Sequence, residues 1–322
     1  MNDSVIELEP VDAGDREEFG RAVLAGLSRM PRAIPARFLY DSRGSALFDA
    51  ICELPEYYLT RTETAILTAC AGDIARLAGP RCALIEFGSG SSIKSRLLLD
   101  AMPELTIYAP IDISRRHLDQ SVARLNGDYR GLHIAPVCAD FMTIETLPPV
   151  VASARRRVGF FPGSTIGNLE PWEAAAFLRR ARRMVGDDGA MVIGIDLRKD
   201  AGMLHAAYND GAGVTAAFTL NLLRRMNREL DGNFNLAAFE HDASYNPDLG
   251  RIEIYFRSLR DQLVTVAGRS FAFSAGERVH TEYSYKYDPA QFAAAASEAG
   301  FRLAQTWTDP AEMFAVTWLV AG

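Results

Sequence analysis

CALIEFGSGSSIKSRLLLDAM (82–102) is the stretch of this 322-residue chain that decides its fold. We predict a buried strand over CALIEF (82–87) and a helix over SIKSRLLLDAM (92–102). Between them, Gly88 and Gly90 allow the backbone to turn tightly and to approach a ligand closely. A buried strand, a glycine turn and a helix in this order predict the first unit of a parallel sheet that binds a nucleotide at this turn.

The alternation of strand and helix continues on both sides of this stretch. We predict helices over 15–30, 45–54 and about 60–78, where Thr60 or Thr62 would be the N-cap and Glu63 would complete a capping box. Further predicted strands are LTIYAPID (105–112), LHIAPVCAD (132–140), VGFFPG (158–163) and GAMVIGIDL (189–197). Strands that alternate with helices predict an α/β fold with a doubly wound, mostly parallel sheet.

From 198 to 286 the alternation breaks. A long helical stretch at about 200–229 is followed by the strand-like segments RIEIYFRSL (251–259), QLVTVA (262–267), RSFAF (269–273) and VHTEYSYKY (279–287). A helix over 288–299 and two final strands, FRLAQTWTD (301–309) and FAVTWLVAG (314–322), then resume the first pattern. We therefore predict a doubly wound core of 61–197 plus 287–322 and a second, α+β domain of 1–60 plus 198–286.

The composition narrows the class of protein. The net charge of −7 disfavours a nucleic-acid partner, because binders of the phosphate backbone usually carry a basic face. The five histidines and four cysteines show no metal-ligand spacing, so we predict no metal site. The acidic N-terminus resembles no signal peptide, and no apolar run approaches a membrane span. We expect a cytoplasmic, monomeric protein that acts on a small molecule without membrane or nucleic-acid partners.

Polar side chains at successive strand ends indicate the cofactor. The third glycine of a dinucleotide fingerprint is replaced by Ile93, which disfavours a nicotinamide-dependent dehydrogenase. An acidic residue two positions before the first glycine, here Glu86, is typical of S-adenosylmethionine enzymes. Asp112 could accept both ribose hydroxyls, and Asp140 with Phe141 could hold the adenine. Two roles are open for Lys94: it is either a solvated helix residue or a ligand of the cofactor carboxylate.

Four motifs carry a resemblance to a known family. They are RFLYDSRGSALFDAICELPEYYLTRTE (37–63), EFGSGSSIKS (86–95), FFPGSTIGNLEP (160–171) and HTEYSYKY (280–287). From about Pro35 to the C-terminus the chain resembles the histidine-specific, S-adenosylmethionine-dependent methyltransferases of ergothioneine biosynthesis. These have a class I, Rossmann-like methyltransferase core and convert histidine to its Nα-trimethyl betaine, hercynine. The resemblance implies that the second domain binds the substrate.

The resemblance also implies the site residues. Asn168 and Tyr208 would hold the substrate carboxylate, with Tyr58 beside the amine; Tyr58 and Asn168 would be the catalytic pair. Glu282 and Ser284 would recognise the imidazole, which Tyr40 would reach directly or through water, and Ile254 stands where the family pattern has a methionine. The residues implied for S-adenosylmethionine are Gly88, Lys94, Asp112, Asp140 and Phe141, beside Glu86 and Gly90 from the turn itself.

The strand over 282–287 allows two interpretations. Glu282, Ser284 and Lys286 share one face, and three tyrosines share the other. From alternation alone, the tyrosines would point inward and the charges would be solvated. The resemblance favours the opposite interpretation, because a carboxylate and a hydroxyl two residues apart could satisfy both imidazole nitrogens.

Three functions remain open at this point. The leading one is the Nα-methylation of histidine. The first alternative is methylation of tryptophan or a related indole amine by the same type of site. The second is a sensor that binds S-adenosylmethionine and an amino acid without turnover.

Overall fold

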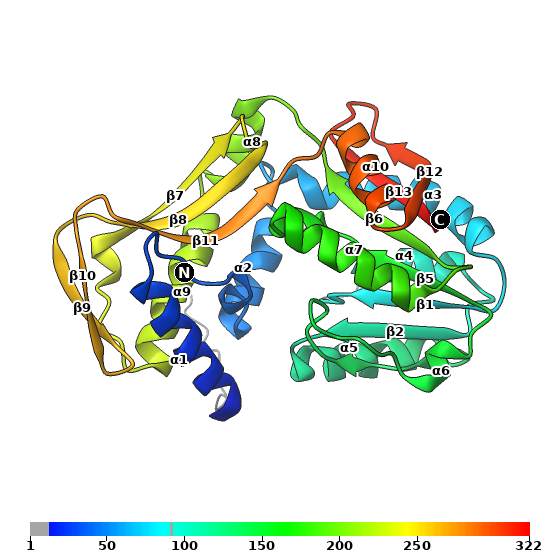
Figure 1. Cartoon of the computed structure of the whole chain (residues 1–322), viewed down its shortest axis with the longest axis horizontal. Coiled ribbons are helices and arrows are strands. Elements are labelled where there is room, and N and C mark those ends of the chain that lie inside the picture. Colours follow the sequence, from blue (N-terminus) through cyan, green and yellow to red (C-terminus); the bar gives the residue numbers. More distant parts are fainter. Residues whose placement is uncertain (1–12, 91–92) are drawn as a thin grey trace. The chain divides into compact units, whose positions relative to one another are not determined.

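The computed structural model describes residues 13–90 and 93–322 and divides the chain into two compact units (Figure 1). We call Leu59–Lys199 with Tyr285–Gly322 the core unit, and Asp200–Ser284 with the described part of Met1–Tyr58 the accessory unit. Each of the three divisions lies two residues from the expected domain boundary. The chain therefore passes between the units three times.

The core unit is built on one mixed sheet. Its strands are β1 (Cys82–Phe87), β2 (Ile107–Asp112), β3 (His133–Ile134), β4 (Val137–Cys138), β5 (Arg156–Phe161), β6 (Ala190–Asp196), β12 (Phe301–Thr308) and β13 (Phe314–Ala321). The order across the sheet is β12-β13-β6-β5-β1-β2-β3, and β4 also pairs with β2. All pairs are parallel except β12 with β13 and β13 with β6. This topology confirms the doubly wound, mostly parallel fold.

Helices cover both faces of this sheet. They are α3 (Tyr58–Ala78), α4 (Ile93–Ala101), α5 (Arg115–Asp128), α6 (Pro149–Ala152), α7 (Pro171–Val185) and α10 (Pro289–Glu298). Alternate residues of β1 face opposite sides, so Ala83, Ile85 and Phe87 join the core with α7 and α10. Cys82 and Leu84 join the core with α3 and α4. The near-continuous apolar sequence of β1 follows from burial on both faces.

The accessory unit combines helices with antiparallel strands. It contains α1 (Ala13–Ser28), α2 (Ser42–Cys52), α8 (Ala201–Tyr208), α9 (Val214–Glu229) and the short helices η1 (Ala36–Leu39) and η3 (Leu236–Ala238). Its strands are β7 (Phe239–Asn246), β8 (Arg251–Ser258), β9 (Gln262–Val266), β10 (Arg269–Phe273) and β11 (Arg278–Tyr285). One sheet has the order β11-β8-β7, and β9 pairs with β10. These additional sheets confirm an α+β second part of the fold.

Several local predictions were wrong. Helix α3 begins at Tyr58, so Thr60 and Thr62 lie inside the helix and form no capping box with Glu63. The third predicted strand is two short strands, β3 and β4, which pair with different ends of β2. The stretch 200–229 is two helices, because α8 ends at Tyr208 and a new helix starts where the amides of Val214 and Thr215 donate to the Asp210 carboxylate. Strand β7 was not predicted at all.

Candidate active site

The glycine turn after β1 has the geometry that its sequence requires. Gly88 and Gly90 have φ angles of 77° and 43°, a region that favours glycine. The amides of Gly88 and Ser89 both donate to the carbonyl of Ile111, at 2.9 and 3.2 Å. The turn is therefore tied by its main chain to the end of β2. This edge lies at the carboxyl ends of the strands, where doubly wound sheets bind ligands.

Glu86, the penultimate residue of β1, is a buried carboxyl group. It accepts hydrogen bonds from Ser95 Oγ, at 2.6 Å, and from the Tyr108 hydroxyl. Burial raises the pKa of Glu86 to about 7, although both hydroxyl donors counteract the shift. Its contacts connect β1 to α4 and β2 beneath the turn. That Glu86 contacts the cofactor remains a prediction.

Asp112 lies at the end of β2, opposite the turn. Its two carboxylate oxygens accept from the amides of Gly90, at 3.1 Å, and Ser114, at 2.9 Å. Each oxygen keeps a further lone pair. The carboxylate is thus oriented by backbone amides and can still accept a pair of vicinal hydroxyls.

Asp140 and Phe141 follow β4 at the same edge. The amide of Met142 donates to Asp140 Oδ1 at 2.7 Å. The Phe141 ring packs at 5.3 Å from that of Phe161, and a Cβ added to Gly88 would lie 3.7 Å from Phe141. The structure therefore brings Phe141 over the glycine turn, where an aromatic face suits a planar base.

Lys94 lies near Gly163, at the start of a short glycine loop that ends at Asn168. Lys94, on α4, forms an ion pair with the buried carboxylate of Glu63, so it is no solvated surface residue. Asn168 ends η2 (Thr165–Asn168), which begins after Ser164 in a left-handed conformation with φ 54°. The amide of Asp196 donates to Ser164 Oγ at 2.8 Å, and this fixes the strained residue to β6.

A buried charge network, missed in the sequence, supports this loop. Asp196, at the end of β6, pairs with Lys286 at 2.7 Å and with Lys199 at 2.5 Å. Burial lowers the pKa of Lys199 to about 8, while Asp196 acts in the opposite direction. The next residue after Lys286 is Tyr287, whose hydroxyl donates to the carbonyl of Ile166 in η2 at 3.1 Å. Lys286 is thus a structural anchor of the loop that carries Asn168.

Within the accessory unit, the predicted substrate residues lie in an aromatic cluster. The Tyr40 ring packs at 5.5 Å from Phe48 and 5.3 Å from Phe218, and the Tyr57 ring lies 6.1 Å from Tyr208. Burial, followed by the nearby charge of Glu282, raises the pKa of Tyr40 well above 10. About one-third of the Tyr40 residue is exposed, and its ring meets those of Phe48 and Phe218 at an edge. Phe48 and Phe218 had no signal in the sequence that distinguished them from core residues.

Strand β11 contributes the polar side of this cluster. Glu282 is only 8% exposed and Ser284 is equally buried. The charged face of this strand is therefore the inner one, and the tyrosines are half-buried. Ser284 Oγ lies 2.8 Å from the Tyr208 hydroxyl, a buried hydrogen bond. Tyr208, predicted to hold the substrate carboxylate, is thus hydrogen-bonded to Ser284, predicted to recognise the imidazole.

Two neighbours complete the accessory-unit site. Ile254 is buried on β8, and its carbonyl accepts from Thr281 Oγ, beside Glu282 in β11. His241, unmarked in the sequence, has Nε2 at 2.8 Å from the Tyr208 carbonyl and Nδ1 at 2.9 Å from Thr219 Oγ1. Burial lowers the pKa of His241, so the neutral ring is favoured. His241 therefore orients the end of α8 that carries Tyr208.

Tyr58, at the first position of α3, is buried.

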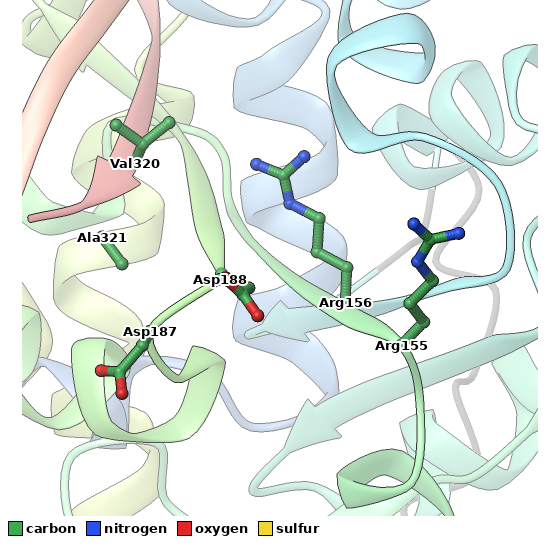
Figure 2. A pocket seen from close by; sticks show the side chains of 7 residues that line it. Arg155, Arg156, Asp187, Asp188, Val320 and Ala321 are labelled. Carbon is green, nitrogen blue, oxygen red and sulfur yellow. The ribbon is translucent and has the colours of Figure 1, made fainter.

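A separate pocket lies at the opposite edge of the core sheet (Figure 2). It is lined by Arg155, Arg156, Asp187, Asp188, Gly189, Val320 and Ala321. Arg155 and Asp188 precede the amino ends of β5 and β6. Ligands of doubly wound sheets bind at the carboxyl ends, so this pocket is no candidate for the active site. Two arginines and two aspartates line it, so the lining has no excess charge.

Two further observations limit the chemistry. Among residues 13–90 and 93–322, no group of three or more His, Cys, Asp or Glu side chains could hold a metal ion. In the same ranges, no helix has the length and apolar character needed to cross a membrane.

Nearly the whole chain takes part in one family match. Residues 19–321 match the histidine-specific, S-adenosylmethionine-dependent methyltransferases. The chain belongs to this family. It is therefore an enzyme that uses S-adenosylmethionine, and the strand-end residues of the core unit are of the types that suit this cofactor. The family match disfavours a dehydrogenase or a sensor.

Named relatives agree with the family. The chain is 43% identical to a histidine N-alpha-methyltransferase of Mycolicibacterium smegmatis, over 94% of this chain and 95% of the relative. It is 39% identical to a histidine N-alpha-methyltransferase of Mycobacterium tuberculosis, over 92% and 93% of the two chains. Ergothioneine biosynthesis protein 1 of Neurospora crassa is 29% identical over 86% of this chain, which spans 32% of that longer protein.

Proposed function

We propose that this enzyme methylates the α-amino nitrogen of L-histidine three times and releases hercynine for ergothioneine biosynthesis. The observation that carries the substrate choice is the burial of Glu282 and Ser284 on one strand, beside an aromatic cluster. A carboxylate can accept from one ring N–H, and a hydroxyl can serve the other nitrogen. The names of the relatives support the same substrate.

Positioning supplies most of the catalysis in this proposal. Bound S-adenosylmethionine supplies a methyl group on a positively charged sulfur. The amine lone pair would attack this methyl carbon in line with the sulfur, which leaves as a neutral thioether. Asn168 and Tyr208 would hold the substrate carboxylate, and Tyr58 would orient the amine; no covalent nucleophile from the protein is needed. The substrate nitrogen must lose a proton before each of the three transfers, because the free amino acid and the first two products are ammonium ions. Tyr40 and Tyr57 remain neutral phenols, because burial raises both pKa values well above 10.

The same aromatic groups suit the product. Each transfer gives a singly charged ammonium group; the first two can lose a proton, and the third is a permanent cation without an N–H donor. Such a cation is attracted to the faces of tyrosine and phenylalanine rings. The Tyr57 ring lies 6.1 Å from that of Tyr208, a candidate ligand of the substrate carboxylate, so these two rings suit such a cation.

The test is mass spectrometry of all twenty amino acids incubated with S-adenosylmethionine and the protein. We expect histidine to gain three methyl groups and the other amino acids to remain unmodified. The controls are reactions without S-adenosylmethionine and with the Asn168→Asp variant. Methylated tryptophan as the main product would replace histidine with an indole substrate. Binding of both ligands without any product would support the sensor.

A further inference from the structure

Glu63 joins four elements of the core unit through one carboxylate. It lies in the second turn of α3 and is 1% exposed. Its two oxygens accept from the amide of Gly163 at 2.9 and 2.8 Å, and it forms an ion pair with Lys94 on α4. A Cβ at Gly194 in β6 would lie 2.0 Å from Glu63 Oε1. The glycine therefore leaves the space that this carboxylate occupies.

These contacts lie between the two ligand sites proposed for the core unit. Lys94 is the candidate ligand of the cofactor carboxylate. Gly163, with φ 80°, begins the loop that ends at Asn168, the candidate ligand of the substrate carboxylate. A Cβ at Gly163 would lie 3.6 Å from Lys94 Nζ, so the lysine reaches the start of this loop. The buried carboxylate of Glu63 thus contacts both Lys94, from the candidate cofactor site, and Gly163, from the loop of the candidate substrate site.

We propose that Glu63 is a positioning residue that orients Lys94 toward the carboxylate of S-adenosylmethionine and fixes the start of the Asn168 loop. The inference rests on the cofactor site of the proposed function. An ammonium group has three donors, so the ion pair leaves others for a ligand. The lysine side chain is 17% exposed and already ordered, which reduces the entropy that its immobilisation would otherwise cost on binding.

Calorimetry with two ligands separates this role from general stability. S-adenosylhomocysteine carries the amino-acid end that Lys94 would bind, whereas 5′-methylthioadenosine lacks it. Glu63→Gln keeps the size and an oxygen for the Gly163 amide but removes the charge that holds Lys94. We expect it to weaken S-adenosylhomocysteine about tenfold and to leave methylthioadenosine within about twofold of wild type.

Two more variants complete the design. Lys94→Met should weaken S-adenosylhomocysteine at least as much, and the double variant should bind no more weakly than Lys94→Met, because Glu63 acts through Lys94. Glu229→Gln is the matched control: it neutralises another buried glutamate, which pairs with Arg225 at 3.0 Å in the accessory unit. It should leave the ratio of the two affinities unchanged.

The outcomes distinguish the two levels of the proposal. Equal weakening of both ligands by Glu63→Gln, no weakening of either, or additive effects in the double variant would each overturn the role of Glu63. If Lys94→Met leaves S-adenosylhomocysteine unaffected, the cofactor site itself is misassigned and the inference falls with it. Thermal unfolding of every variant verifies that the folded protein is being compared.

Discussion

The two units hold their candidate ligand groups by different means. In the core unit, Asp112 and Asp140 accept hydrogen bonds from backbone amides at 2.7–3.1 Å, and the glycine turn is tied to β2 by its own amides. In the accessory unit, the Tyr208 hydroxyl bonds to Ser284 Oγ, and Tyr40 is positioned by neighbouring rings. The main chain organises the first set, and side chains organise the second.

This difference bears on how each set of ligand groups responds to substitution. Groups oriented by main-chain amides keep their geometry when neighbouring side chains change. Groups oriented by other side chains change with them, so substrate preference can shift without loss of the cofactor site. Four substitutions test this contrast.

Asn168→Asp should give the largest and most selective loss. It keeps the shape of the side chain but sets an anion against the substrate carboxylate, at a cost of about 3 kcal/mol or more. Histidine binding, measured by calorimetry with S-adenosylhomocysteine present, should weaken by over about a hundredfold. The affinity for S-adenosylhomocysteine should hardly change. An equal loss of both ligands would indicate a folding defect and remove Asn168 from substrate binding.

Glu282→Ala tests whether side-chain contacts determine the substrate. The loss of a hydrogen bond to a ring N–H should cost histidine about 2–3 kcal/mol. Tryptophan or leucine should lose less, because the wild-type carboxylate must be desolvated without a partner when they bind. The measurement is kcat/KM for histidine over tryptophan in both proteins. Glu253→Ala on β8, whose carboxylate pairs with Arg251 at 2.9 Å, is a control for removing an acidic strand residue. An unchanged ratio would leave Glu282 without a role in recognition.

Asp112→Ala tests the groups that the main chain orients. It removes the charged acceptor of the ribose hydroxyls, at a total cost of about 1.5–3 kcal/mol. S-adenosylhomocysteine should bind at least about tenfold more weakly, while the histidine-to-tryptophan ratio stays at the wild-type value. A cofactor affinity within about twofold of wild type would place the ribose elsewhere.

Glu86→Gln probes stability beneath the turn. Burial raises the pKa of Glu86 from 4.5 to about 7, so folding favours its protonated form. Its contribution to stability is fully present below pH 4.5 and is lost as the pH rises to about 7. The neutral glutamine cannot ionise, so the free energy of unfolding of the variant relative to wild type should rise by about 1–2 kcal/mol between pH 5 and pH 8. Urea unfolding at the two pH values measures it. A difference that stays constant with pH would mean that the carboxyl group titrates normally.

The sequence predicts the core unit well for a physical reason. Parallel strands buried on both faces are continuous apolar runs, and their carboxyl ends meet at one edge, so Asp112 and Asp140 could be related to the glycine turn without a structure. Glu63 was misassigned as part of a capping box, because its partner Gly163 lies a hundred residues later. Local spacing cannot reveal such a contact.

The accessory unit is less predictable from local patterns. Its candidate site combines residues 40, 57, 208 and 282, which no periodicity connects. Alternation alone would have placed the tyrosines of β11 inward, and only the family resemblance favoured the observed burial of Glu282 and Ser284. Strand β7 was missed because FEHDASYN is too polar to resemble a strand, although it pairs with β8 over its full length.

The route of the chain through the core sheet has a consequence for its synthesis on the ribosome. Strand β6 is buried along its whole length and pairs with β13, which follows only after the entire 200–284 segment has been made. At ordinary rates of translation this interval lasts on the order of ten seconds. During that time one edge of β6, AMVIGID (190–196), has no strand to pair with, and unpaired apolar edges promote aggregation. The nascent chain is therefore most vulnerable between the completion of β6 and the arrival of its last strand, and chaperone dependence should concentrate in that window.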